Sequence, residues 1–256
     1  MTAGTPVQNS PHYYDRLYHL VGQRYERDFD VYAAIVSEMP HARVLDLGGG
    51  FGRLAKPIAT LGHPVTVVDC SAEMIDLGRD GLTRELPEIA GRVEWLLADI
   101  TKPIHDLPLN WYHVALCAHH TVNELLDGLD GFFANVASHL ETAGIAAIAA
   151  LPEAPYERPG VVEFLDGFRT ADRAEWIVTT AVVRDEPRSH RHRLYFFYDE
   201  FRDGVLASRH VRWIDRRVWT RTELESAAEQ HGLRARGHHR GDGFFLFEKV
   251  GDFERR

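Results

Sequence analysis

The chain has 256 residues, 45% of them apolar, and a formal net charge of −9 at pH 7. This length and composition allow a full core in one large domain, and the acidic balance argues against nucleic-acid partners, which usually meet a basic surface. No apolar stretch reaches the roughly 18 residues needed to cross a bilayer, and the N-terminus lacks a secretory signal pattern. We therefore expect no membrane partner and a cytoplasmic location.

The first 40 residues predict helices before any strong strand signal. Aromatic and aliphatic side chains recur at helical spacing between Pro11 and Met39. Most of them must pack against a core. Tyr13 and Tyr14 stand at the start of this segment, and a phenol can hydrogen-bond a ligand heteroatom.

Residues 44–52 read Val-Leu-Asp-Leu-Gly-Gly-Gly-Phe-Gly, an apolar strand that leads into a glycine-rich turn. Glycine is favoured where a ligand must come close to the backbone or where φ is positive. A strand, such a turn and a helix at 53–61 are typical of a nucleotide-type pocket in an α/β fold. The dinucleotide fingerprint starting at Gly48 would need glycine at position 53, which is Arg53, so a hydride-transferring enzyme is not favoured.

The next strands each end at a chemically useful position. The run 65–68 ends at Asp69, where a carboxylate can accept hydrogen bonds from both hydroxyls of a ribose. The run 93–97 leads to Asp99, and the fourth strand, 111–118, leads to two histidines. Parallel strands would place all these ends at one edge of the sheet.

These features, in this order, resemble the class I methyltransferases that use S-adenosylmethionine, whose first motif is D-x-G-x-G-x-G. The resemblance covers about Arg43 to Ala150. It implies an α/β, Rossmann-like, doubly wound sheet of seven strands in the order 3-2-1-4-5-7-6. It leaves two roles open, because Asp46 could contact the donor or only orient the glycine turn, and Met74, on an apolar helix face, suits the core better than the adenine wall. The implied cofactor-binding residues are Asp46, Gly48, Gly49, Gly50, Gly52, Asp69, Cys70, Met74, Asp99, Ile100 and Ala118.

The loop after the fourth strand carries the candidate catalytic residues. His119 or His120 could take the proton that an O–H or N–H nucleophile must lose; the alternative is that one packs in the core and the other caps a helix. Glu124 stands where small-molecule N-methyltransferases of the family often have a histidine. The family's helical lid would bring Tyr14 to the acceptor. The histidine pairs lack the spacing of a zinc site, so we expect no metal.

The remaining chain predicts an insertion and a closing hairpin. Within 153–217, three β-like runs (175–184, 192–201 and 205–213) suggest an antiparallel sheet that caps the acceptor pocket. A helix then begins near Thr220, and two antiparallel strands end the fold. We predict a single domain over residues 1–256, with the lid at 1–40, the core at 41–152 and 218–250, and the insertion at 153–217.

The predicted function is methyl transfer from S-adenosylmethionine to a small-molecule acceptor. The C-terminal region looks like that of small-molecule N-methyltransferases, which favours an amine nitrogen of a bacterial secondary metabolite, an amino sugar or an amino acid. An O- or C-methyltransferase is the first alternative, and a protein of this fold that binds the cofactor without transferring methyl is the second. Two cysteines at separate strand ends suggest reduced thiols. A homodimer is compatible with the sequence.

Overall fold

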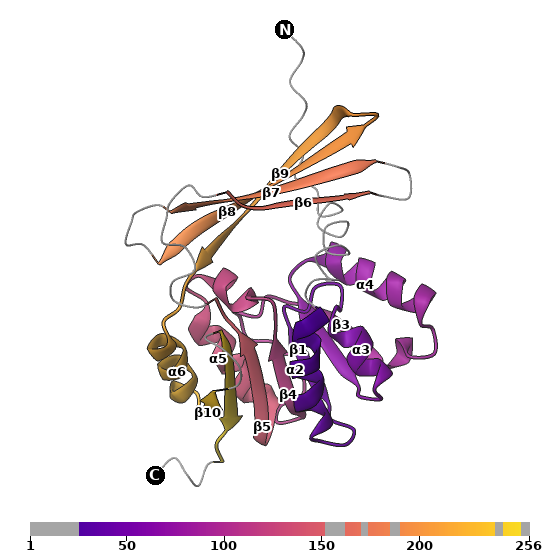
Figure 1. Ribbon diagram of the computed structural model, residues 1–256. Helices are drawn as coiled ribbons and strands as arrows, with labels where there is room; N and C mark the ends of the chain where they lie inside the picture. Colours follow the sequence, from indigo (N-terminus) through magenta and orange to yellow (C-terminus); the bar gives the residue numbers. More distant parts are fainter. Residues whose placement is uncertain (1–25, 152–161, 170–173, 185–189, 239–242, 252–256) are drawn as a thin grey trace. The chain divides into compact units, whose positions relative to one another are not determined.

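The computed structural model describes residues 26–151, 162–169, 174–184, 190–238 and 243–251 (Figure 1). These residues fall into two compact units. The larger unit runs from helix α2 to strand β5 and from helix α6 to strand β11, and the smaller unit holds strands β6 to β9. The expected lid residues before α2, including Tyr13 and Tyr14, lie outside the described residues.

A seven-stranded sheet forms the centre of the larger unit. Its order is β3-β2-β1-β4-β5-β11-β10, which is the predicted 3-2-1-4-5-7-6 when the strands of this sheet alone are numbered. The first five strands pair in parallel, and β11 and β10 complete the sheet as the predicted antiparallel hairpin. The strands are β1 (Val44–Leu47), β2 (Val65–Asp69), β3 (Val93–Leu97), β4 (Tyr112–Cys117), β5 (Leu140–Ala149), β10 (Leu233–His238) and β11 (Phe244–Lys249).

Helices cover both faces of this sheet. Every residue of β1 is buried, as expected for a parallel strand between two helical layers. One core cluster joins the sheet to α5 and α6, and a second joins it to α2, α3 and α4. The helices are α2 (Glu26–Ser37), α3 (Ala55–Thr60), α4 (Ala72–Glu85), α5 (Leu129–His139) and α6 (Arg221–Gln230), with short 3-10 helices η1 (Ala90–Arg92) and η2 (Thr121–Leu125).

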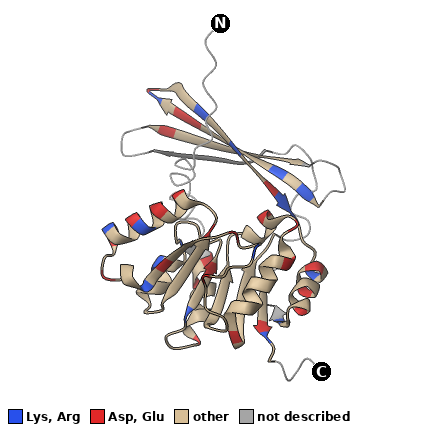
Figure 2. Cartoon of the chain, turned by 180° about the vertical axis from the view of Figure 1, so that it is seen from behind, with Lys and Arg blue, Asp and Glu red and all other residues tan. Residues whose placement is uncertain are grey.

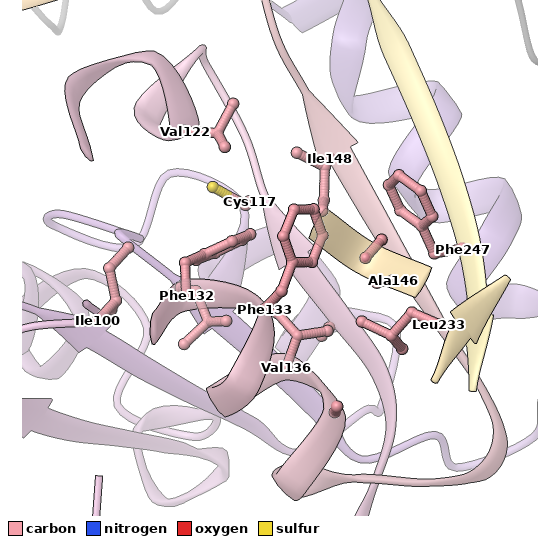
Figure 3. Close-up of a cluster of buried hydrophobic side chains, with 14 of the residues drawn as sticks. Ile100, Cys117, Val122, Phe132, Phe133, Val136, Ala146, Ile148, Leu233 and Phe247 are labelled. Carbon is pink, nitrogen blue, oxygen red and sulfur yellow. The ribbon is translucent and has the colours of Figure 1, made fainter. Parts of the chain in front are cut away.

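Aromatic rings from α5 hold the first cluster together. Phe132 and Phe133 are fully buried and meet edge to face at 5.2 Å, and Phe133 meets Phe247 of β11 in the same way. Figure 3 shows these rings between α5 and the strands β5 and β11. Edge-to-face pairs of this kind add to the stability gained from burial.

The smaller unit is a four-stranded antiparallel sheet in the order β6-β7-β8-β9. Its strands are β6 (Val162–Arg169), β7 (Glu175–Arg184), β8 (Arg191–Arg202) and β9 (Val205–Arg217). The three predicted strands are present, and β9 is longer than predicted. The turn between β8 and β9 has positive φ at Asp203 and Gly204, as a tight hairpin requires.

Strand β6 is an addition to the predicted fold. It pairs with β7 alone, at the edge of the sheet. Its sequence contains Asp166 and Gly167, both poor strand formers, so the strand depends on its neighbour more than on local propensity.

Charge is concentrated on the helices and on the antiparallel strands, whereas the strands of the seven-stranded sheet are mostly uncharged (Figure 2). This distribution reflects the two helical layers that cover the central sheet. Among the described helices, none combines the length and the apolar character needed to span a membrane.

Candidate functional site

The glycine turn after β1 adopts backbone conformations that other residues rarely take. Gly48, Gly50 and Gly52 have φ values of +72°, +56° and +79°. A Cβ atom at Gly48 would lie 2.4 Å from the methyl group of Thr121, far inside van der Waals contact. The turn after β1 and the loop after β4 are therefore packed directly against each other.

Asp46 lies beneath this turn and is only 1% exposed. Within the described part of the chain, neither of its carboxylate oxygens has a hydrogen-bond partner. A Cβ atom at Gly49 would lie 2.6 Å from Asp46 Oδ2, so the turn closes over the carboxyl group without donating to it. The alternative in which Asp46 orients the turn through backbone N–H groups is thus not what this geometry shows.

Burial dominates the ionisation of Asp46. It raises the pKa of the carboxyl group to about 7, while the nearby Arg53 lowers it and Asp69 raises it further. The Arg53 guanidinium also makes two hydrogen bonds with Asp28 of α2, at 2.7 and 2.8 Å. Position 53, where the dinucleotide fingerprint would need glycine, therefore carries a cation that connects α2 to the site.

Asp69, at the end of β2, joins two loops through its carboxylate. The amide of Gly50 donates to Oδ2 at 2.9 Å, and the amide of Ser71 donates to Oδ1 at 2.9 Å. Each carboxylate oxygen can accept a second hydrogen bond. Asp69 therefore fixes the glycine turn while keeping acceptor capacity for a ligand.

Helix α4 supplies one wall beside the turn. Ser71 caps the helix by accepting a hydrogen bond from the Met74 amide, which fixes the first turn of α4. Met74 is 8% exposed, and its Cε atom would lie 3.1 Å from a Cβ atom at Gly50. Trp95 of β3 fills the space that side chains at Gly52 and Gly78 would need.

The loop after β3 is held in place at Asp99 and Ile100. The amide and hydroxyl groups of Thr101 donate to Asp99 Oδ1 at 2.9 and 2.7 Å, and these bonds lower the pKa of the carboxyl group. The side-chain amide of Asn135 in α5 donates to the carbonyl groups of Ile100 and Lys102. Asp99 is exposed and Ile100 is buried.

The Cys70 thiol, next to Asp69, is affected by several of the predicted acids. Burial raises the pKa of its thiol, and Asp69, Asp99 and Glu124 each raise it further. The parallel pairing of β1 with β2 and β4, and of β2 with β3, places the carboxyl ends of these strands at one edge of the sheet, as the sequence predicted.

His119 and His120 follow Ala118, the buried residue after β4, and both occupy the left-handed region, with φ values of +56° and +64°. Two consecutive non-glycine residues in this region cost on the order of 1–3 kcal/mol each. Strain of this kind persists only where the surroundings hold it, and it concentrates at functional sites. His120 is the N-cap residue of η2 but makes no side-chain capping bond there.

The structure brings together nearly all the predicted site residues. The cofactor candidates lie around the ends of β1, β2 and β3, and Ala118, His119, His120 and Glu124 lie after β4; Tyr14 lies outside the described residues. Thr121, Trp95 and Arg53 were not predicted, because their roles come from contacts between distant segments. Among the described residues, no group of three His, Cys, Asp or Glu side chains could hold a metal ion.

Residues 44–144 match a family model described as a methyltransferase domain. No protein with a curated description is detectably similar in sequence. The chain is similar in structure to DesVI of Streptomyces venezuelae, with 19% identity, a TM-score of 0.74, and coverage of 94% of this chain and 99% of that chain.

Two further solved structures show the same fold. The sugar N-methyltransferase KedS8 from Streptoalloteichus sp is 15% identical, with a TM-score of 0.76 and coverage of 98% of this chain and 97% of that chain. CalS10, an amino pentose methyltransferase from Micromonospora echinaspora solved with S-adenosylmethionine bound, is 17% identical, with a TM-score of 0.73 and coverage of 97% and 100%. These structures confirm the predicted fold, and the family match supports the predicted kind of domain for residues 44–144.

Proposed function

We propose that this chain, whose residues 44–144 match a methyltransferase domain model, transfers a methyl group from S-adenosylmethionine to a small-molecule acceptor. One observation supports this proposal best. The strained glycine turn, the buried Asp46 and the bridging Asp69 meet at one edge of the seven-stranded sheet. Turns of this kind let a ligand approach the backbone closely. Both cysteines are free thiols, which suits the reducing cytoplasm in which we place the enzyme.

The residues at this edge fit the chemical groups of S-adenosylmethionine. Asp69 offers its remaining lone pairs to the ribose hydroxyls, and Asp99 and Ile100 stand beside them for the adenine. Met74, next to Gly50, forms the wall of the adenine pocket. Cys70 and Ala118 complete the lining.

Asp46 would attract the positively charged donor through the negative charge of its carboxylate. A buried carboxyl group with a pKa of about 7 ionises readily when a positive charge arrives nearby, because an opposite charge favours the charged form. The ammonium and sulfonium groups of the donor bring that charge. Binding should therefore release a proton from Asp46 near neutral pH.

When bound, S-adenosylmethionine supplies a methyl group already activated by a positively charged sulfur. The chain then has to hold the nucleophile in line with that group and exclude water, and such positioning alone can supply several kcal/mol. His119 or His120 would take the proton of an N–H or O–H nucleophile. Glu124 lies in the same loop, and Tyr14 from the N-terminal segment would contact the acceptor.

We propose an amine nitrogen of a bacterial secondary metabolite, an amino sugar or an amino acid as the acceptor. The support comes from CalS10 and KedS8, which are described as methyltransferases of amino pentoses and sugar nitrogens. An amine needs only to arrive neutral, whereas a hydroxyl group needs a base. The strained histidine pair keeps O-methylation as the second candidate.

A panel of amines, phenols and carboxylates, incubated with methyl-labelled S-adenosylmethionine, tests this proposal. We expect label in an amine product, with fragmentation placing it on nitrogen. Label on oxygen or carbon would exclude N-methylation. Tight donor binding with no labelled product across amino sugars and amino acids would favour the alternative of a protein that binds the cofactor without transferring methyl.

A further inference from the structure

The loop after β4 is strained at its start and buried at Val122 and Asn123. The left-handed residues His119 and His120 are followed, after Thr121, by Val122 and Asn123, each with 0% exposure. Figure 3 places Val122 and Cys117 at the edge of the core cluster around Phe132. A buried segment of irregular backbone needs partners for its polar groups.

Local contacts close the first part of this loop. The Thr121 amide and hydroxyl groups both donate to the carbonyl group of Ala118, at 3.2 and 3.0 Å. The Asn123 amide donates to the carbonyl group of His120 at 2.9 Å. These bonds shape the turn, but they join residues of the same loop and cannot anchor it to the rest of the fold.

Two hydrogen bonds from distant segments add to the packing of Thr121 against the glycine turn. The Leu151 amide, after β5, donates to Asn123 Oδ1 at 2.8 Å. The indole N–H of Trp219 donates to the carbonyl group of Val122 at 3.0 Å, across 97 positions of sequence. The Val122 carbonyl lies two residues from His120, so of these two distant hydrogen bonds the one from Trp219 lies nearer to the histidine pair.

Trp219 is itself held rigidly. Its side chain is 5% exposed and belongs to the core cluster of α5 and α6. The next residue, Thr220, forms a capping box with Glu223 that fixes the start of α6. The direction of the indole N–H is therefore set by the C-terminal part of the core.

We propose that Trp219 is a positioning residue of the acceptor site, which holds the left-handed conformation of His119 and His120 through the carbonyl group of Val122. This inference rests on the proposed function of the histidine loop. Trp219 acts on the acceptor side, so its loss should spare the donor side, which is built from Asp69 and the glycine turn.

The variant Trp219→Phe removes the N–H donor and keeps an aromatic ring, and Tyr112→Phe is its matched control. Tyr112 is also buried and donates a hydrogen bond at 3.0 Å, but to Thr66 in the sheet. In histidine-labelled protein, with signals assigned from His119→Asn and His120→Asn, we expect Trp219→Phe to shift the 13Cα signals of the pair. Tyr112→Phe should leave them in place.

Kinetics give the second readout. With the most reactive amine of the panel, Trp219→Phe should lower kcat by roughly 10- to 100-fold, the range expected for a small misplacement of a catalytic group. Its Kd for S-adenosylhomocysteine should stay within about twofold of the wild type. Unchanged histidine signals with unchanged kcat would overturn the inference, and so would an equal effect of Tyr112→Phe.

If Trp219→Phe does not fold, hydrogen exchange in the wild type tests the inference without the variant. The indole N–H of Trp219 and the amides of residues 121–125 should open together. If the loop amides exchange while the indole N–H stays protected, Trp219 does not hold the loop. Failure of the wild type to bind S-adenosylhomocysteine would instead contradict the proposed function and leave these exchange rates to decide on Trp219.

Discussion

Asp46 shows how one residue can be costly for folding and useful for binding. Its carboxyl group is buried without a hydrogen-bond partner among the described residues, and a buried ionised carboxylate is unfavourable unless an opposite charge compensates it. Arg53 compensates part of the charge. A cationic ligand at the glycine turn would compensate the rest.

The first prediction concerns the pH dependence of stability. The Asp46 pKa is about 7 in the folded protein and about 3.9 in an unfolded chain. The stabilising effect of the bound proton is thus complete below about pH 4 and is lost as the pH rises through about 7. Between pH 5 and pH 8 the wild type should lose on the order of 2–3 kcal/mol relative to Asp46→Asn, from about two pKa units.

Urea unfolding of both proteins at the two pH values measures this difference. The control is Asp106→Asn, which changes an exposed carboxyl group. Parallel stability curves for the wild type and Asp46→Asn would show that Asp46 does not ionise in this range.

The second prediction concerns Asp69. Asp69→Ala should weaken S-adenosylmethionine binding by about 1.5–3 kcal/mol, the range for hydrogen bonds to a charged group. The structure adds a second cause, since the variant also releases the amide of Gly50. Asp76→Ala, an exposed change in α4, is the control for calorimetric titration. Equal affinity of Asp69→Ala and the wild type would rule out the ribose role.

The third prediction concerns the proton acceptor. His119→Asn or His120→Asn should lower turnover by about 10²–10⁴-fold, the usual contribution of a general base, while the donor affinity stays nearly unchanged. Steady-state kinetics measure this, with His105→Asn as an exposed control. Full activity of both variants would reduce the pair to a structural role, and loss of donor affinity would assign it to the cofactor.

At the scale of elements, the turn from β1 to α3 depends on two separate properties of glycine. Gly52 needs a positive φ, and it also leaves room for Trp95, which would lie 2.6 Å from a Cβ atom there. Gly62, after α3, has a φ of +98° but no atom within 4 Å of a Cβ position. Substitutions at these two glycines therefore allow the effect of backbone strain to be measured separately from the effect of steric overlap.

The fourth prediction uses this pair. Both Gly52→Ala and Gly62→Ala should incur about 1–2 kcal/mol of left-handed strain, and Gly52→Ala should lose a further 1–3 kcal/mol by overpacking against Trp95. Urea unfolding gives the stabilities, and donor binding should fall only in Gly52→Ala. If both variants lose the same stability, Trp95 does not constrain the turn.

Sequence periodicity predicted the elements that carry their own pattern. A few residues of sequence suffice to predict the buried strands β1 and β2, the capped start of α6 and the hairpin at Asp203 and Gly204. Strand β6 does not, because its sequence around Asp166 and Gly167 lacks alternation and relies on β7. The loop after β4 contains only the short 3-10 helix η2 before α5 begins.

At the scale of the whole molecule, the parallel sheet explains why separated motifs meet at one site. The ends of β1 to β4 lie at one edge, so Asp46, Asp69 and Asp99 could be predicted together from their positions in or just after the last residues of strands. Contacts such as Trp219 with Val122, or Asn135 with Ile100, have no local signature. They depend on how α5 and α6 pack, which no single segment specifies.

Thermal unfolding with the demethylated product S-adenosylhomocysteine tests most directly whether this edge of the sheet binds S-adenosylmethionine. A ligand that binds only the folded chain should stabilise it by about 2.7 kcal/mol at a hundred times its Kd. We predict micromolar affinity and a clear rise in Tm at millimolar product. An unchanged Tm at that concentration would contradict the account.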